Sequence, residues 1–554
     1  MSAKRSLVRN TTKYKSENLS NEIRVLIQNA QIALKSCVYP LAIQLSQKLE
    51  SLLKDNPERS SYYLSSILWQ IRAYQALKDT NSLERRIQDY IDESLRLNHA
   101  QHLIQAYRLR TQCQIDSADF NAAVETLESA ITAAIDIHDA KNAFELLMHI
   151  SSLELNLCRY SDAKDHLMMA MSMIDDVNLS SDKFSEVMSM GYRQLCELFI
   201  KIGDGESAVE SLQLAMASKI TDLEENCLQM LLYSRIKKQA GDLKESLQMI
   251  QSVDNIIQNS PEYPNRHHQL DSVRLEMAQL HWDCGEYDRA LEEIGSIHTD
   301  NVSLQRAIAL TRYQWAVSAG IPGCDPDKAE SDFRNMPVPD DETDRSLQFA
   351  AELTQNALLI MRGQYKTARE NLKHLAEKSS FLELMPICTK ANQLIAEIDL
   401  ARRDYLKAAE ELVDVAKNYL EQCDQVSTNY VMALTLRAQY EEMASSVNGD
   451  TVTLKSEDET VLNELFTDCD KYIEQNYIEA FLDLALQLSF YTYRIGYIGK
   501  CKELVQKISG YIQPDKMAYR AMRYYWLKYE LEHDDSLLQK VKDIAQMNQF
   551  RMIK

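Results

Sequence analysis

The sequence has few of the residues that interrupt helices. Among its 554 residues there are 13 glycines and 10 prolines, and no glycine precedes Gly191. Glycine and proline are the strongest breakers of regular helices, so their scarcity predicts helices along almost the whole chain. We expect an all-α protein without a β-sheet.

Long apolar runs are also missing. The stretch from Ala480 to Phe490 is interrupted by Asp483 and Gln487, and it is shorter than the roughly 20 residues that span a bilayer. No apolar segment follows the basic residues near the N-terminus, so a secretory signal is not expected. The sequence therefore predicts neither a membrane-spanning segment nor a membrane partner.

Paired cysteines and an excess of positive charge are absent as well. Eleven cysteines are scattered singly, with no CxxC pair, which favours a reducing compartment, the nucleus or the cytoplasm. The net charge of -21 repels phosphates, so direct binding of nucleic acid is not expected. Residues 1–17 are an exception, because Lys4, Arg5, Arg9, Lys13 and Lys15 precede the first acid, Glu17. This basic arm is either a solvated tail or a localisation or docking element.

What the chain does contain is a short pattern that recurs about every 40 residues. A turn is followed by an aromatic residue or Leu, and three positions later by a small residue. The copies include Tyr39 with Ala42, Phe120 with Ala123, Tyr160 with Ala163, Leu243 with Ser246, Tyr287 with Ala290, Tyr365 with Ala368, and Tyr405 with Ala408. A fixed period of this length predicts stacked helical hairpins. The small residue would let the two helices of a hairpin approach closely.

The residues Gly285, Tyr287, Ala290, Ile294 and Ile297 resemble the tetratricopeptide-repeat (TPR) family. So do Gly363, Tyr365, Ala368, Leu372 and Leu375, and also Tyr405, Ala408, Leu412 and Val415. The chain departs from the family in lacking its first-helix Trp and its closing Pro, and in having the longer period. The resemblance implies a right-handed superhelical solenoid of about twelve TPR-like hairpins, whose first helices form a concave surface. In repeat style the chain is also similar to the small subunit of the cohesin loader and to the fifth subunit of the anaphase-promoting complex.

Composition divides the chain into six segments. The basic arm of residues 1–17 precedes a repeat array over residues 18–320. Residues 321–344 hold clustered prolines and acids and predict a loop or joint. Further repeats are expected over residues 345–444, a polar insertion over residues 445–460, and Tyr-rich repeats with a cap over residues 461–554.

No catalytic motif accompanies the repeats. His281 and Cys284 have a spacing that a zinc site could use, but both fall at packing or turn positions of a repeat, so neither a metal nor a cofactor is predicted. Paired acids such as Glu292 and Glu293 fit an exposed helix face better than a catalytic pair, which needs burial. We therefore expect no enzyme activity.

These observations predict a scaffold or adaptor that grips an extended segment of a protein partner in its groove, as a subunit of an intracellular complex. The negative charge favours a basic or amphipathic segment. Polar residues of the first helices, and the aromatic residues near the C-terminus, are the candidate contacts: Gln112, Glu154, Arg193, Glu197, Arg235, Arg274, Glu276, Gln355, Tyr491, Tyr493, Tyr497, Tyr524, Tyr525 and Trp526. The aromatic residues could instead cap the core. A cargo or signalling adaptor, and a ligand-responsive regulatory solenoid hinged near residues 321–344, are the alternatives.

Overall fold

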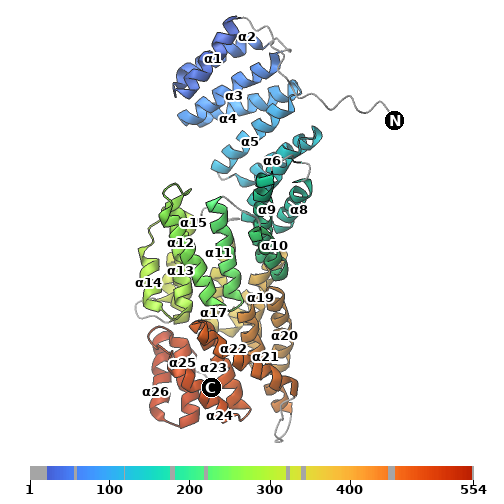
Figure 1. Cartoon of the computed structure of the whole chain (residues 1–554). Helices are drawn as coiled ribbons and strands as arrows, with labels where there is room; N and C mark the ends of the chain where they lie inside the picture. The colour runs from blue at the N-terminus through green and yellow to red at the C-terminus, as the bar shows by residue number, and fades with distance from the viewer. Residues whose placement is uncertain are drawn as a thin grey trace, which may run out of the picture. The chain divides into compact units, whose positions relative to one another are not determined.

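Helices make up nearly all of the chain that the computed structural model describes, namely residues 21–54, 59–117, 119–174, 177, 181–217, 222–319, 325–338, 345–446 and 456–551. These residues form 26 helices and no strand (Figure 1). None of these helices is both long and apolar enough to cross a membrane. The all-α prediction is confirmed. The basic arm of residues 1–17 lies outside the described residues, as do residues 321–324 and 339–344 of the expected joint and residues 447–455 of the expected insertion.

The helices follow one another with short turns. They are α1 Asn21–Lys35, α2 Tyr39–Leu53, α3 Ser60–Leu77, α4 Thr80–Arg96, α5 Ala100–Asp116, α6 Phe120–Asp136, α7 Ala140–Asn156, α8 Tyr160–Met173, α9 Ser181–Ile202, α10 Gly205–Ala217, α11 Leu223–Gln239, α12 Leu243–Asn259, α13 Arg266–Asp283, α14 Tyr287–Ser296, α15 Val302–Ala319, α16 Pro326–Arg334, α17 Arg345–Met361, α18 Tyr365–Phe381, α19 Met385–Ala401, α20 Tyr405–Glu421, α21 Gln425–Ser446, α22 Ser456–Glu474, α23 Ile478–Arg494, α24 Ile498–Ser509, α25 Ala518–Glu532 and α26 Asp535–Asn548.

The recurring sequence pattern marks the turn between the two helices of a hairpin. One turn residue has a positive φ, which ends the first helix in the left-handed region. The small residue three places after the aromatic lies at the helix contact, and Ala123, Ala163, Ala290, Ala368 and Ala408 are all 0% exposed. Odd-numbered helices are therefore the first helices of hairpins, and even-numbered helices are the second. Helix α16 falls within the expected joint and buries Phe333.

The chain divides into two compact units. One consists of Met1–Leu153 with Ser172–Asn178, and the other of Glu154–Met171 with Leu179–Lys554. In the first unit the core lies between α1 and α5 and includes Leu49, Leu64, Ile67 and Tyr90. We refer below to the first unit and the second unit.

In the second unit the array folds back on itself. The first helix of a hairpin contacts the first helix that comes ten helices later, and this holds for α9 with α19, α11 with α21, α13 with α23, and α15 with α25. Successive turns of the array, five hairpins apart, thus pack directly on one another. The handedness of this winding stays a prediction.

Glycines lie where the turns of the array meet. A Cβ added at Gly241 would lie 2.9 Å from Tyr472, at Gly285 it would lie 3.3 Å from Ile478, and at Gly363 it would lie 2.6 Å from Arg551. Other hairpin turns hold the same positive φ with residues such as Cys37, Lys78 and Arg403. The left-handed conformation alone therefore does not require glycine here, and the close approach of a distant segment accounts for the choice.

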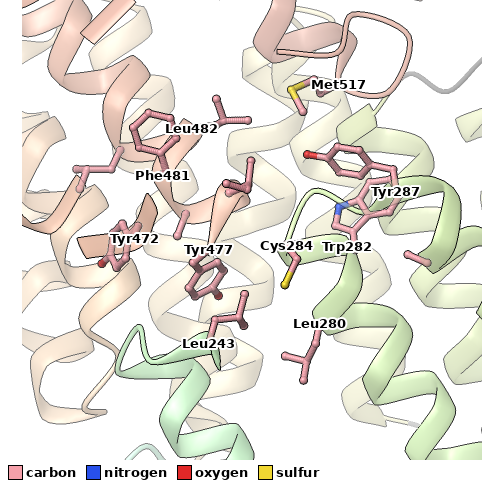
Figure 2. Packing of buried hydrophobic residues seen from close by; sticks show 14 of the residues in the cluster. Leu243, Leu280, Trp282, Cys284, Tyr287, Tyr472, Tyr477, Phe481, Leu482 and Met517 are labelled. Atoms are coloured by element: carbon pink, nitrogen blue, oxygen red, sulfur yellow. The ribbon is translucent and has the colours of Figure 1, made fainter. Parts of the chain in front are cut away.

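A large hydrophobic cluster fills the junction between these turns. Figure 2 shows Leu243, Leu280, Trp282 and Tyr287 facing a second group that contains Tyr472, Tyr477, Phe481 and Leu482. The first group belongs to α12–α14, and the second to α22, α23 and the turn between them. Trp282 also stacks on Trp315 of α15, with ring centroids 4.4 Å apart. The junction is a continuous core between segments about 190 residues apart in the sequence, as the Tyr287–Glu479 contact illustrates.

Candidate functional site: the polar face of the first helices

A row of polar contacts joins consecutive first helices of the second unit. Arg193 of α9 donates to both carboxylate oxygens of Glu225 on α11, at 2.8 and 2.9 Å. Arg235 of α11 pairs with Glu276 of α13, and Gln279 of α13 donates to Thr311 of α15 at 3.0 Å. Each repeat is thus tied to the next through its first helix.

Several charged side chains in this row keep contact with solvent. The side chain of Arg235 is 52% exposed, and that of Glu197, which pairs with Arg193 at 3.4 Å, is 39% exposed. Lys238 is 33% exposed and lies 2.6 Å from Asp283. Burial lowers the pKa of Lys238, but Asp283 outweighs it and raises that pKa, so the ammonium stays charged. We call Glu197, Arg235, Lys238 and Glu276 the polar face.

The structure separates the predicted contacts of the first helices into different environments. Glu154 is 1% exposed and its carboxylate lies 2.8 Å from His166. Arg274 is two residues from Glu276 and therefore on another side of α13, where it lies 3.7 Å from Asp271. Gln112 of the first unit donates to Asp116 within its own helix at 2.8 Å. Gln355 donates to Glu330 of α16 at 3.0 Å.

The aromatic residues near the C-terminus are mainly packing residues. Tyr491 and Tyr524 are buried, at 1% and 5% exposure. Trp526 stacks on Phe490 with centroids 5.4 Å apart, and Tyr493 donates to Glu530 at 3.1 Å. Tyr525 lies beneath Lys540, and Tyr497 is 41% exposed. This arrangement favours the alternative in which most of these residues complete the core.

An ionic network at the junction between turns was missed by sequence reasoning. Tyr287 donates to Glu479 at 2.6 Å. Arg520 donates to Glu479 and to Asp483, both at 2.7 Å. Burial raises the pKa of Glu479, while Arg520 opposes that rise. The network needs residues from α14, α23 and α25, and no local spacing in the sequence brings these three helices together.

Two histidines, His281 and His166, each lie against a glutamate of the same hairpin. From the sequence, His281 was considered as a metal ligand and His166 was not considered. His281 is 0% exposed and its Nδ1 lies 2.6 Å from Glu293. The same spacing of twelve residues joins His166 to Glu154 and Tyr233 to Glu245. This spacing spans the turn of a hairpin, so it was a signal that could have identified Glu154 as an internal partner. Among the described residues no group of three or more metal-ligating side chains is arranged to hold an ion.

Comparison with solved structures finds matches at low sequence identity and low TM-score. No protein-family model and no curated protein matches the sequence. The apo form of RapI is 10% identical with a TM-score of 0.38, and the match covers 69% of this chain and 99% of RapI. A Rap protein complexed with competence and sporulation factor is 14% identical with a TM-score of 0.35, over 73% of this chain and 100% of that one. The Cut9–Hcn1 hetero-tetramer of APC/C is 10% identical with a TM-score of 0.34, over 95% and 87% of the two chains.

The chain has a TPR-like helical-repeat fold. The assignment of this fold rests on the helix order, the turn geometry and the buried alanines of the chain itself.

Proposed function

We propose that this chain is a non-enzymatic scaffold that holds an extended segment of a protein partner along the polar face of α9, α11 and α13. The chain would act as one subunit of a multiprotein complex in the nucleus or cytoplasm. The observation that carries the proposal is the polar face itself, where Glu197 and Arg235 are fixed by ion pairs and remain 39% and 52% exposed.

Fixed but exposed side chains suit the recognition of an extended segment. A repeat array presents a few contacts per repeat, so many contacts, each of small binding free energy, add up along a long partner. Side chains already held by neighbours lose little conformational entropy when a partner binds. The overall charge of -21 speeds encounter with a basic or amphipathic segment. Ten described cysteines are free thiols, which supports the intracellular location.

Charge reversal on the polar face tests the proposal. We expect the double variant Glu197→Lys with Glu276→Lys to lose partners that wild-type chain captures from its native cells, measured by quantitative mass spectrometry. The matched control is Glu370→Lys with Glu377→Lys, which changes the net charge equally at exposed positions of α18. Glu154 is left unchanged because it is buried.

Loss of Glu276 leaves Arg235 without its carboxylate, so folding is checked by the thermal melt. If the first variant is destabilised, Glu197→Gln with Glu276→Gln replaces it, because this variant places no lysine beside Arg193 or Arg235, and Glu370→Gln with Glu377→Gln is then its control. A partner set that is the same for wild type and the polar-face variants at low salt, where exposed charges act most strongly, would refute the proposal. The captured subunits also decide the class of complex, since chromatin or ligase subunits and motor or trafficking proteins imply different processes.

A further inference from the structure

Two arginines, on the two first helices that flank α23 in the second unit, have no ion-pair partner among the described residues. Arg437 lies on α21 and Arg523 on α25, on either side of α23. Neither side chain forms an ion pair with any described residue, and the buried Nε of Arg437 has no hydrogen-bond partner there. The chain has 82 acids and only 61 basic residues, so two arginines without an acidic partner are unexpected.

Both guanidinium groups lie against the same aromatic ring. The Cζ of Arg437 is 5.6 Å and that of Arg523 is 5.0 Å from the centroid of Phe490. Trp526 stacks on the same ring, and its plane is tilted by 22°. The negative face of an aromatic ring attracts a cation, but the contact leaves both positive charges uncompensated.

The acids on the adjoining first helices already have other partners. Glu441 accepts two hydrogen bonds from Arg494, at 2.6 and 2.8 Å. Asp483 accepts two from Arg520, at 2.7 and 2.8 Å, and Glu397 accepts one from Gln393 at 2.8 Å. Burial lowers the pKa of Arg437, and Arg523 lowers it further, while Glu441 partly opposes both. The surroundings therefore disfavour the charge that Arg437 carries, and an added anion would relieve the cost.

We propose that Arg437 and Arg523, with Phe490 between them, form a binding site for a side-chain carboxylate of an acidic peptide segment. Arginine offers a planar fork of N–H donors that matches a carboxylate, and both side chains are half-buried, which leaves part of each open to a ligand. Trp526, which is only partly buried, would contact the apolar part of an Asp or Glu side chain. The site goes beyond the proposed function, which concerns α9, α11 and α13 and favours basic or amphipathic segments there.

The experiment measures binding of a fluorescein-labelled hexaglutamate peptide to the full chain by fluorescence anisotropy at low salt. We expect saturable binding by wild type. The double variant Arg437→Gln with Arg523→Gln should weaken it about tenfold or more, since loss of a charged partner in a desolvated contact is costly. The matched control Lys502→Gln with Lys542→Gln removes the same charge at exposed positions and should bind like wild type. The conservative Arg437→Lys with Arg523→Lys keeps the charge without the fork and should retain intermediate affinity.

Thermal melts separate a lost site from a lost fold. The double glutamine variant removes both unpaired charges, so it should leave the melting temperature unchanged or raise it. The proposal is overturned if wild type does not bind the peptide, if the glutamine variant binds within about twofold of wild type, or if the lysine control loses as much affinity. Displacement by inorganic phosphate as effective as displacement by unlabelled peptide would also overturn it, in favour of a small-anion site. Partner capture by the Glu197 and Glu276 variants is a separate readout, so either proposal can fail alone.

Discussion

At the scale of single residues, Tyr287 stabilises both its own hairpin and the contact with the next turn of the array. Its ring packs edge-on to Trp282 of the same hairpin, with centroids 4.8 Å apart. Its hydroxyl in addition donates to Glu479, in the next turn of the array. Glu479 is 9% exposed, so it depends on hydrogen bonds to offset its desolvation.

We predict that Tyr287→Phe destabilises the chain by about 1–3 kcal/mol, because it keeps the ring and leaves Glu479 with one donor fewer. Urea unfolding followed by circular dichroism measures the change. The control is Tyr497→Phe, at a ring that is 41% exposed, and it should alter stability by no more than about 0.5 kcal/mol. Equal effects of the two substitutions would show that the hydroxyl of Tyr287 is not a structural contact.

His102 makes the first unit sensitive to pH. Burial, with a smaller effect of His99, lowers the pKa of His102 to about 4. In the unfolded chain the pKa of a histidine is about 6.5. Its Nδ1 lies 2.6 Å from the hydroxyl oxygen of Tyr90. Between these two pKa values the unfolded chain binds a proton that the folded chain excludes, so stability falls as the pH drops from about 6.5 towards 4.

We therefore expect the melting temperature of wild type to fall between pH 7.5 and pH 5, and to fall less in His102→Gln. Between pH 7.5 and pH 5 the variant should lose about 1–2 kcal/mol less free energy of unfolding than wild type, after allowing for the partial exposure of His102. His267→Gln changes an exposed histidine and should keep the full pH dependence of wild type. A pH dependence that is identical in wild type and His102→Gln would contradict this interpretation.

At the scale of helices and turns, a glycine is found where one hairpin turn lies against the backbone of another. Gly205, the first residue of α10, lies against the backbone of the turn between α20 and α21, and an added Cβ would be 2.4 Å from the carbonyl carbon of Gln422. Gly295 of α14 has nothing within 4 Å of the same position. The two glycines are both helical and differ mainly in this contact.

Gly205→Ala should accordingly cost about 1–3 kcal/mol, since backbone must move to make room. Gly295→Ala should be neutral or stabilise by about 0.5–1 kcal/mol, because alanine is the better helix former. Both are measured by urea unfolding of the full chain. If Gly205→Ala is as stable as Gly295→Ala, the turns of α9–α10 and α20–α21 do not touch in the folded protein.

The sequence predicted stacked helical hairpins, but not which hairpins contact one another across successive turns of the array. The pattern of turn, aromatic and small residue placed Ala290, Ala368 and Ala408 correctly, because these contacts lie within one hairpin. Contacts between helices ten apart depend on how far each repeat rotates, and that rotation has no local sequence pattern. Glu154 was expected in the groove because the twelve-residue spacing that pairs it with His166 across a hairpin turn was not recognised in the sequence.

At the scale of the whole chain, the proposed function makes the second unit a support for partner segments. Its successive turns are held together by Tyr287, Glu479 and Arg520, and by the apolar cluster of Figure 2. Polar side chains are left on the first helices, balanced in charge at Arg235 and Glu276 and positive at Arg437 and Arg523. A partner that alternates basic and acidic stretches would fit both places.

Site-specific photo-crosslinking tests the central claim most directly. Benzoylphenylalanine is placed at Glu197, on the polar face, or at Glu370, an exposed position of α18, and the chain is irradiated in its native cells. The account predicts a discrete crosslinked partner from position 197 and none from position 370. A partner crosslinked from position 370 and not from position 197 would contradict it.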